Sequence, residues 1–289
     1  MITLWIHLKK DRMKVSIIGH GFVGKALENA LNNSVETLII DPIYKNKISD
    51  ITLFEPDCVF ICVPTPMADG GNQDLSILDE VIHEIKVLDV NSEIILKSTV
   101  LPNNIAIIEE SIPNIIYNPE FLTEKNSFED FINGDLIVLG SKNKNFKKIS
   151  SFYKNHTKCT TKNFILTDLI AASLIKYTIN SYLASKVMFF NELHNLFKKS
   201  GTDENWENFI DAVSSDSRIG RSHMKVPGPD GRYGFGGACF PKDTQALYNY
   251  SLDEESPLKI LKKVIDLNNH IRGSYESETD RENEQNINF

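Results

Sequence analysis

A cysteine followed closely by proline, lysine and aspartate is the clearest sign of chemistry in this sequence. Cys239 ends the run Gly-Phe-Gly-Gly-Ala-Cys, and Pro241 suits the first turn of a helix starting there. A thiol at a helix N-terminus lies at the positive end of the helix dipole, and Lys242 adds a second cationic field, so both favour the thiolate. Asp243 supplies a carboxylate beside it. We therefore predict a nucleophilic cysteine; the alternative is a glycine-rich turn with a buried, inert thiol.

Two more polar side chains lie on a long helical pattern, 167–200, which Thr167 or Asp168 would cap. Lys176 and Asn180 are four residues apart, so they project together from one side of a helix whose other sides are apolar. A solvated surface lysine is the alternative. The helix has apolar residues on more sides than one two-domain monomer could cover, which predicts a homodimer formed through it.

The first half of the chain carries the pattern of a dinucleotide site. A β-branched run at 14–18 leads into a glycine turn and a helical pattern to about Leu31, and a second strand, 35–40, ends in Asp41. In such a turn two glycines allow the close approach of a pyrophosphate and the third packs helix on strand, while the acid bonds a ribose hydroxyl. We therefore predict NAD as the cofactor, although Asp41 before Pro42 is also typical of a turn. The turn consists of Gly19, His20, Gly21, Phe22, Val23 and Gly24.

Strands and helices continue to alternate up to about residue 140. Strands are expected at 58–63, 94–96, 115–117 and 136–139, and a helix at 74–88. Thr65 and Thr99 come just after two of these strands, at the carboxyl edge where open α/β sheets bind ligands. Further on, Glu120 and Glu124 are four residues apart and would share one face of a helix, although two solvated surface acids would give the same pattern.

The expected fold class is α/β. A Rossmann-type, doubly wound parallel sheet, 13–166, is followed by an all-helical central domain with a long helix, 167–272. Further helices are expected at 203–214 and 257–271, and the Pro- and Gly-rich loop between them is long enough to suggest ligand binding. The polar, acidic stretch 273–289 is expected to be a disordered tail.

Composition narrows the class of protein. With 289 residues, 41% of them hydrophobic, the chain can bury the cores of two domains. A net charge of −8 argues against nucleic acid as a main partner. No run approaches the length of a membrane span, and the opening residues have the reverse order of a signal peptide. Cysteines without paired spacing indicate a reducing, cytoplasmic compartment, and the scattered histidines predict no metal site.

Taken together, these residues resemble the UDP-glucose 6-dehydrogenase family, in family order from Lys14 to about Arg272. The resemblance is carried by the glycine turn, Val63-Pro64-Thr65-Pro66, Asp74-Leu75-Ser76, Lys97-Ser98-Thr99-Val100, Asn118-Pro119-Glu120-Phe121-Leu122, Lys176 with Asn180, Ser217-Arg218-Ile219-Gly220, and the run from Gly234 to Asp243.

The resemblance implies a role for each matching residue. Cys239 would be the nucleophile and Glu120 the general base, with Lys176, Asn180 and Asp243 around the reacting carbon and its water. Thr99 would serve both catalysis and cofactor binding, and the remaining cofactor contacts would be Thr65, Glu124 and Lys242. The implied substrate contacts are Glu120, Phe121, Leu122, Lys176, Asn180, Phe235, Gly236, Gly237 and Arg218, the last reaching into the neighbouring subunit's site.

The implied reaction explains this set of residues. Oxidation of a primary alcohol to a carboxylate takes two hydride transfers, so two NAD are consumed and the aldehyde between them must be retained. Addition of the thiolate to that aldehyde gives a thiohemiacetal, whose oxidation leaves a thioester that a base-activated water hydrolyses. Lys176 would stabilise the oxyanions, and Asn180 would position the water.

Two questions stay open at this point. Family members continue into a second nucleotide-binding-like domain that holds much of the UDP group, and this chain is expected to lack it. UDP-glucose is the leading substrate, but UDP-N-acetylmannosamine and GDP-mannose remain, because residues at the reacting carbon do not read the base or the C2 substituent. A partner protein that binds NAD or a nucleotide sugar without turnover is the alternative from another class.

Overall fold

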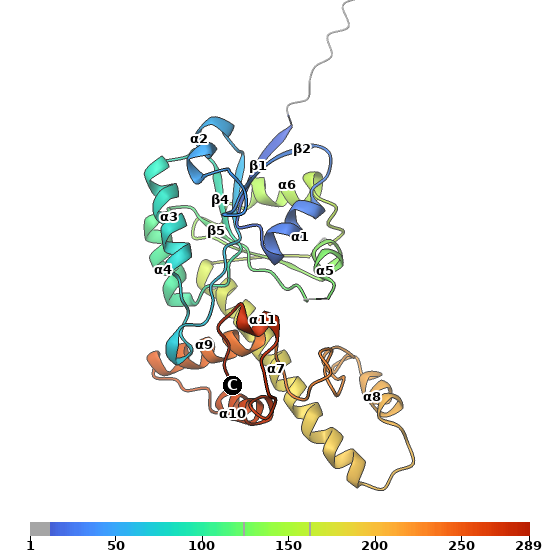
Figure 1. The fold of residues 1–289 in the computed structure, drawn as a ribbon. Helices are drawn as coiled ribbons and strands as arrows, with labels where there is room; N and C mark the ends of the chain where they lie inside the picture. The colour runs from blue at the N-terminus through green and yellow to red at the C-terminus, as the bar shows by residue number, and fades with distance from the viewer. Residues whose placement is uncertain (1–11, 124, 162) are drawn as a thin grey trace, which may run out of the picture. The chain divides into compact units, whose positions relative to one another are not determined.

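The computed structural model describes residues 12–123, 125–161 and 163–289 (Figure 1). The chain forms two compact units. The first comprises the chain up to Pro64 together with Ser76–Ser173, and the second comprises Thr65–Leu75 together with Leu174–Phe289. A segment from the first half of the sequence thus belongs to the second unit. The predicted division of the chain at 166/167 stays a prediction.

The first unit is built on one sheet of seven strands within the described residues, in the order β2-β1-β3-β4-β5-β6-β7. The first five strands run parallel, and a parallel sheet needs both of its faces covered, which explains the continuous apolar sequence of the central strand Cys58–Ile61. The bounds are β1 Met13–Ile18, β2 Val35–Ile40, β3 Cys58–Ile61, β4 Glu93–Leu96, β5 Ile116–Tyr117, β6 Ile137–Gly140 and β7 Phe164–Thr167.

Helices cover both faces of this sheet. Figure 1 shows α3 and α4 on one side and α1, α5 and α6 on the other. The core under α1, α5 and α6 is dense, with the rings of Phe60 and Phe152 5.0 Å apart. The bounds are α1 Phe22–Ala30, α2 Ile51–Phe54, α3 Ser76–Leu88, α4 Pro102–Ser111, α5 Ser127–Asn133 and α6 Lys147–His156, with a 3-10 turn at Ile48–Asp50.

The second unit is helical and is organised along α7, Leu169–Lys199, which starts in the first unit. Asp168 caps this helix by accepting the amide of Ala171 at 2.8 Å, as one of the two predicted caps. Side chains of the middle of α7 pack against Phe235, α9 and α10, and Phe190 packs against α8. The remaining bounds are α8 Trp206–Ser214, α9 Phe240–Asp253, α10 Lys259–Arg272, α11 Asp280–Asn283 and a 3-10 turn at Asp69–Gly71.

The structure differs from the sequence-based expectations in three places. The expected parallel sheet is mixed, because β6 pairs antiparallel with β5, and β7 was not anticipated. Glu120 lies in an extended loop after β5 and not on a helix. The stretch 273–289 contains α11, because Thr279 and Glu282 form a capping box and Glu282 pairs with buried Arg272.

No helix in the described part of the chain is long and apolar enough to span a membrane.

Candidate functional site

The glycine turn after β1 has the geometry that a bound pyrophosphate requires. Gly19 has φ +90°, and a Cβ placed on it would lie 2.8 Å from the backbone carbonyl of Cys62, so only glycine fits. A Cβ on Gly24 would collide with the carbonyl oxygen of Gly19. The third glycine is therefore required because the helix packs closely against the turn. Gly21 has open space beside it and directly precedes α1. A dinucleotide pyrophosphate therefore fits against the turn and the helix N-terminus.

Asp41 follows β2 and connects it to this turn. Its Oδ2 accepts the amide of His20 at 2.7 Å, while Oδ1 accepts the amide of Ile43 at 3.1 Å. The second bond is the turn that the alternative interpretation expected, so the same carboxylate closes a turn and supports the glycine loop. The His20 ring is fixed between Glu28 at 2.7 Å and the Tyr44 hydroxyl at 2.8 Å.

The other predicted residues of the first unit lie at the carboxyl end of the sheet. Thr99 follows β4 and is half-buried. Glu120 follows β5 and is buried, and its Oε2 accepts the amide of Leu122 at 2.7 Å. Leu122 packs against the core of this unit. Phe121 is half-buried in the same loop.

Two further predicted cofactor contacts are Thr65 and Glu124. Thr65 is buried and belongs to the second unit. Glu124 lies outside the described residues.

The second unit brings together the groups around Cys239. Cys239 is the N-cap of α9 and Pro241 lies in the first turn, as the sequence predicted. The carboxylate of Asp243, one turn further, accepts Lys242 Nζ at 2.5 Å and Asn180 Nδ2 at 2.6 Å. Asp243 therefore ties α9 to α7 through its charge-assisted hydrogen bond with Asn180, and it pairs with Lys242 on its own helix.

These groups are withdrawn from solvent to different degrees. Asp243 is 1% exposed and Lys176, one turn before Asn180 on α7, is 2% exposed. Cys239 is half-buried. A buried charge interacts more strongly than a charge in water, so a buried lysine beside a reacting carbon could stabilise a developing oxyanion.

The other three cysteines are poor nucleophiles. Burial raises the pKa of Cys58 and that of Cys62 to about 12, and burial also raises the pKa of Cys159. At neutral pH these thiols stay protonated. A protonated thiol, unlike a thiolate, is a poor nucleophile. The position of Cys239 at a helix N-terminus distinguishes it from them.

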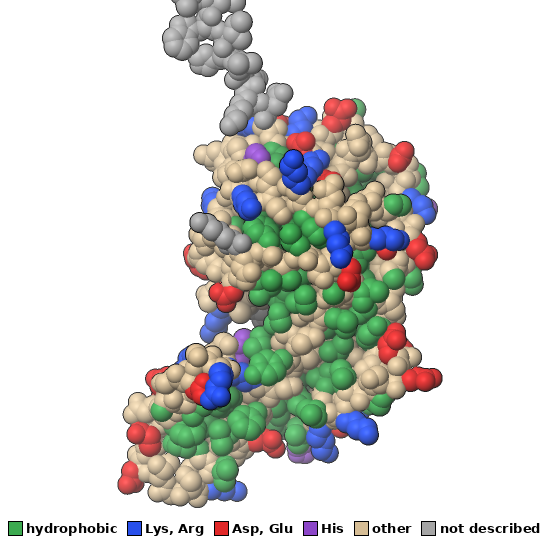
Figure 2. All heavy atoms as spheres, turned by 180° about the vertical axis from the view of Figure 1, so that it is seen from behind, with side chains coloured by type: hydrophobic (Ala, Val, Ile, Leu, Met, Phe, Trp, Pro, Cys, Tyr) green, Lys and Arg blue, Asp and Glu red, His purple; other side chains and the backbone are tan. Residues whose placement is uncertain are grey.

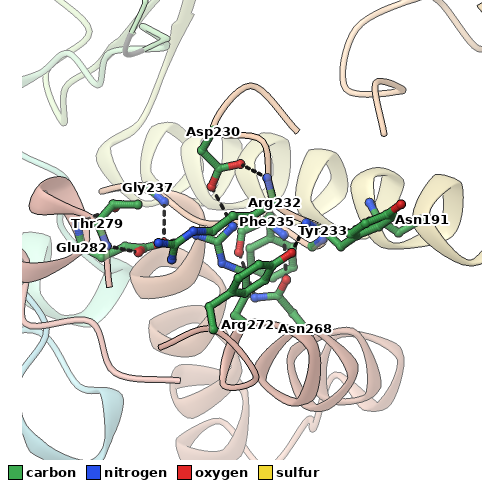
Figure 3. Close-up of polar contacts among 12 residues, drawn as sticks. Asn191, Asp230, Arg232, Tyr233, Phe235, Gly237, Asn268, Arg272, Thr279 and Glu282 are labelled. Carbon is green, nitrogen blue, oxygen red and sulfur yellow. Dashed lines mark hydrogen bonds and ion pairs between the residues drawn. The ribbon is translucent and has the colours of Figure 1, made fainter. Parts of the chain in front are cut away.

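The predicted substrate contacts at 235–237 are held by the protein's own side chains, as Figure 3 shows. The Phe235 amide donates to Asn268 Oδ1 at 2.7 Å, and the Gly237 amide donates to Glu282 Oε1 at 3.2 Å. A Cβ on Gly236 would collide with Arg272 and Glu282. The absence of a side chain at Gly236 thus allows the backbone to lie close to the side chains of Arg272 and Glu282.

Sequence reasoning missed the side chains that support this loop. Asn191, Asn268, Arg272 and Glu282 are all buried, and all bond to the loop or to each other. One sign was available: the spacing of Thr279 and Glu282 is that of a capping box, which predicts a helix start inside the stretch expected to be disordered.

Arg218 lies in the loop after α8 and its side chain is 87% exposed. Asp216, two residues earlier, holds the guanidinium by bonds of 2.9 Å to Nε and 2.5 Å to Nη2. An anionic ligand bound by Arg218 would have to compete with this carboxylate.

Among the described residues, no three His, Cys, Asp or Glu side chains are grouped so that they could hold a metal ion.

Comparison with known proteins gives matches over both units. Residues 28–157 match the NAD binding domain of the UDP-glucose/GDP-mannose dehydrogenase family, and residues 170–270 match that family's central domain. A UDP-glucose 6-dehydrogenase of Rickettsia bellii is 34% identical, over 88% of this chain and 66% of that protein. One of Rickettsia felis is also 34% identical, over 90% of this chain and 58% of that protein.

A solved structure of a UDP-glucose dehydrogenase from Pyrobaculum islandicum superimposes with a TM-score of 0.70 at 25% identity. That match covers 91% of this chain and 69% of the solved one.

The glycine turn, the acid after β2 and the mostly parallel sheet define a dinucleotide-binding protein, with a half-buried cysteine in its helical unit. The chain belongs to the UDP-glucose/GDP-mannose dehydrogenase family, and its cofactor is NAD. It spans about three fifths of the length of the curated relatives that it matches.

Proposed function

We propose that this chain is an NAD-dependent UDP-glucose 6-dehydrogenase that oxidises the sugar C6 alcohol to the carboxylate. One observation carries the proposal: Asp243, on the first turn of the helix that Cys239 caps, accepts hydrogen bonds from Asn180 and from Lys242. This arrangement fixes a cation and a carboxylate within about one helical turn of a thiol and holds the Asn180 amide of α7 against that carboxylate. The names of the relatives from Rickettsia support UDP-glucose as the substrate.

The cofactor is held, in this proposal, by Gly19, Gly21 and the first amides of α1, with Asp41 at its ribose. When bound, NAD accepts one hydride in each of the two oxidation steps. Asp41 would repel a 2′-phosphate, so it favours NAD over NADP. Thr99 and Lys242 are proposed as further cofactor contacts.

The chain's own residues retain and convert the intermediate aldehyde. The Cys239 sulfur attacks the aldehyde carbon, the C=O double bond becomes a C–O single bond, and Lys176 stabilises the oxyanion. Loss of the remaining C–H hydride re-forms the C=O bond and gives a thioester on Cys239. Water, oriented by Asn180 and deprotonated by Glu120, then adds to the thioester and the C–S bond breaks. The sum is one alcohol, two NAD⁺ and one water converted to one carboxylate, two NADH and three protons.

We further propose that the active form is a homodimer through α7. Tyr182, Phe189 and Leu196 follow one another at intervals of seven residues on this helix, and their exposed fractions are 61, 61 and 64%. A repeat of seven is the spacing at which two helices pack side by side. Figure 2 shows that hydrophobic side chains are exposed among the polar ones on the face that it draws. In the dimer, Arg218 of one subunit is proposed to serve the site of the other.

The test is to mix the protein with NAD and, separately, UDP-glucose, UDP-N-acetylmannosamine and GDP-mannose, while NADH is followed by absorbance. The proposal expects NADH with UDP-glucose, at a catalytic efficiency well above that with the other two sugars. A preference for another nucleotide sugar would change the assigned substrate but leave the proposed reaction unchanged. Binding of a nucleotide sugar without NADH would instead make the chain a non-catalytic binding partner.

A further inference from the structure

The stretch 274–289, here called the tail, contacts the segment 232–237, here called the glycine loop, which leads to Cys239 (Figure 3). We propose that the tail is a clamp that fixes the backbone of the glycine loop, and that Glu282 is the positioning residue through which it acts on the nucleotide-sugar site. This proposal rests on the proposed function for the identity of the substrate. It gives a role to an acidic stretch whose composition predicted disorder.

The tail bonds to the glycine loop at three points. The amide of Tyr233 donates to the hydroxyl of Tyr275 at 2.8 Å, and Arg232 Nη1 donates to the carbonyl of Ser277 at 2.7 Å. The Gly237 amide, two residues before Cys239, donates to Glu282 Oε1 at 3.2 Å. Three bonds along six residues restrain the loop over its whole length.

Glu282 is the most constrained residue of the tail. Its side chain and that of Arg272 are both fully buried, and they form an ion pair with 2.5 Å between Oε1 and Nη2. The other carboxylate oxygen, Oε2, accepts the amide of Thr279 at 2.6 Å. Arg272 also pairs with Asp230 at 2.7 Å, at the start of the same loop region.

This ion pair lies directly against the glycine loop. A Cβ on Gly236 would collide with both Arg272 and Glu282, so the backbone there rests on the paired charges. Loss of the Glu282 charge weakens its pairing with buried Arg272, which is costly. A glutamine side chain has one acceptor oxygen, so it cannot accept from both the Gly237 and the Thr279 amides, and the hold on the loop weakens. Asn191 on α7 and Asn268 on α10 hold Gly234 and Phe235, so the loop keeps its fold while its Cys239 end loosens.

The matched variants are Glu282→Gln and Glu284→Gln. Glu284 lies at the end of the same helix but is exposed and pairs with Arg281 at the surface, so its loss removes the same charge without touching the loop. Hydrogen exchange of peptides that cover 234–238 reports the clamp directly, with no need for activity. Steady-state kinetics, at a temperature where all variants are folded by circular dichroism, report its role.

The clamp predicts faster exchange at 234–238 in Glu282→Gln and unchanged exchange in Glu284→Gln. It also predicts that Glu282→Gln raises the KM for UDP-glucose about tenfold, which corresponds to about 1.4 kcal/mol, while the KM for NAD stays within about twofold. A merely structural role would lower kcat and leave both KM values unchanged. Equal exchange in the two variants, or a KM effect shared by NAD, would overturn the proposal.

A second variant covers the case in which Glu282→Gln fails to fold. Tyr275→Phe removes the hydroxyl that accepts the Tyr233 amide and keeps the ring against Arg232, whose guanidinium lies 4.9 Å from the ring centre. Faster exchange at 232–234 supports the clamp, and unchanged exchange refutes it. If the parent protein makes no NADH, the proposed function fails while the exchange result still decides the clamp.

Discussion

Replacement of Asp243 by asparagine should destabilise the second unit strongly. The carboxylate is 1% exposed and accepts Lys242 Nζ at 2.5 Å and Asn180 Nδ2 at 2.6 Å. Asparagine keeps the shape but removes the charge, and its amide presents a donor to groups that are donors themselves. Because the Lys242 side chain is 11% exposed, its cation would be left nearly buried without its partner. Breaking a buried pair in this way costs about 3–5 kcal/mol of unfolding free energy.

Urea denaturation followed by circular dichroism measures this cost, with Asp266→Asn as the matched control. Asp266 pairs with Lys262 on α10, but both side chains are nearly half exposed, so this pair should contribute about 0–1 kcal/mol. The double variant Lys242→Met with Asp243→Asn should recover part of the loss, because no buried cation remains. Equal losses for Asp243→Asn and Asp266→Asn would refute the assignment of Asp243 as the residue that ties α9 to α7.

Three further predictions concern the cofactor and the cysteines. Asp41→Ala should weaken NAD binding and narrow the preference over NADP, as measured by calorimetry with each cofactor; a parent that binds both equally would contradict the role of Asp41. Iodoacetamide at pH 8 should modify Cys239 first, because burial raises the pKa of Cys58 and of Cys62 to about 12. Mass spectrometry of digests identifies the labelled cysteine. Labelling of Cys58 or Cys62 before Cys239 would contradict the prediction. The raised pKa values of Cys58 and Cys62 favour the neutral thiol in the folded state, so their contribution to stability is complete below pH 9 and is lost as the pH rises to 12. The urea concentration at the midpoint of unfolding should therefore fall between pH 9 and pH 12. It should fall less steeply in a variant in which valine replaces both Cys58 and Cys62.

Local patterns predicted the parts of the site that depend on short stretches of chain. The i, i+4 spacing placed Lys176 and Asn180 on one face of α7, and the proline after Cys239 placed the thiol at the start of α9. Both inferences need only helix geometry, which is fixed within a few residues. The glycine turn with Asp41 was predictable for the same reason.

Features that depend on contacts between distant segments were not predictable from these patterns. The direction of β6 is set by which edge strand it meets, and an apolar run carries no record of that direction. The pairing of Arg272 with Glu282 joins two helices across ten residues of polar sequence that composition alone assigns to disorder. This buried ion pair offsets the low apolar content of the tail. Neither Arg272 nor Glu282 alone indicates in the sequence that the tail is folded.

The central claim is that Cys239 retains the aldehyde so that one enzyme performs both oxidations. It is tested most directly by counting NADH formed from a limiting amount of UDP-glucose with excess NAD, in the parent protein and in Cys239→Ser. The claim predicts two NADH per sugar for the parent and at most one for the variant, because a serine alkoxide forms far less readily than a thiolate. One NADH per sugar from the parent, or two from Cys239→Ser at the parental rate, would contradict it.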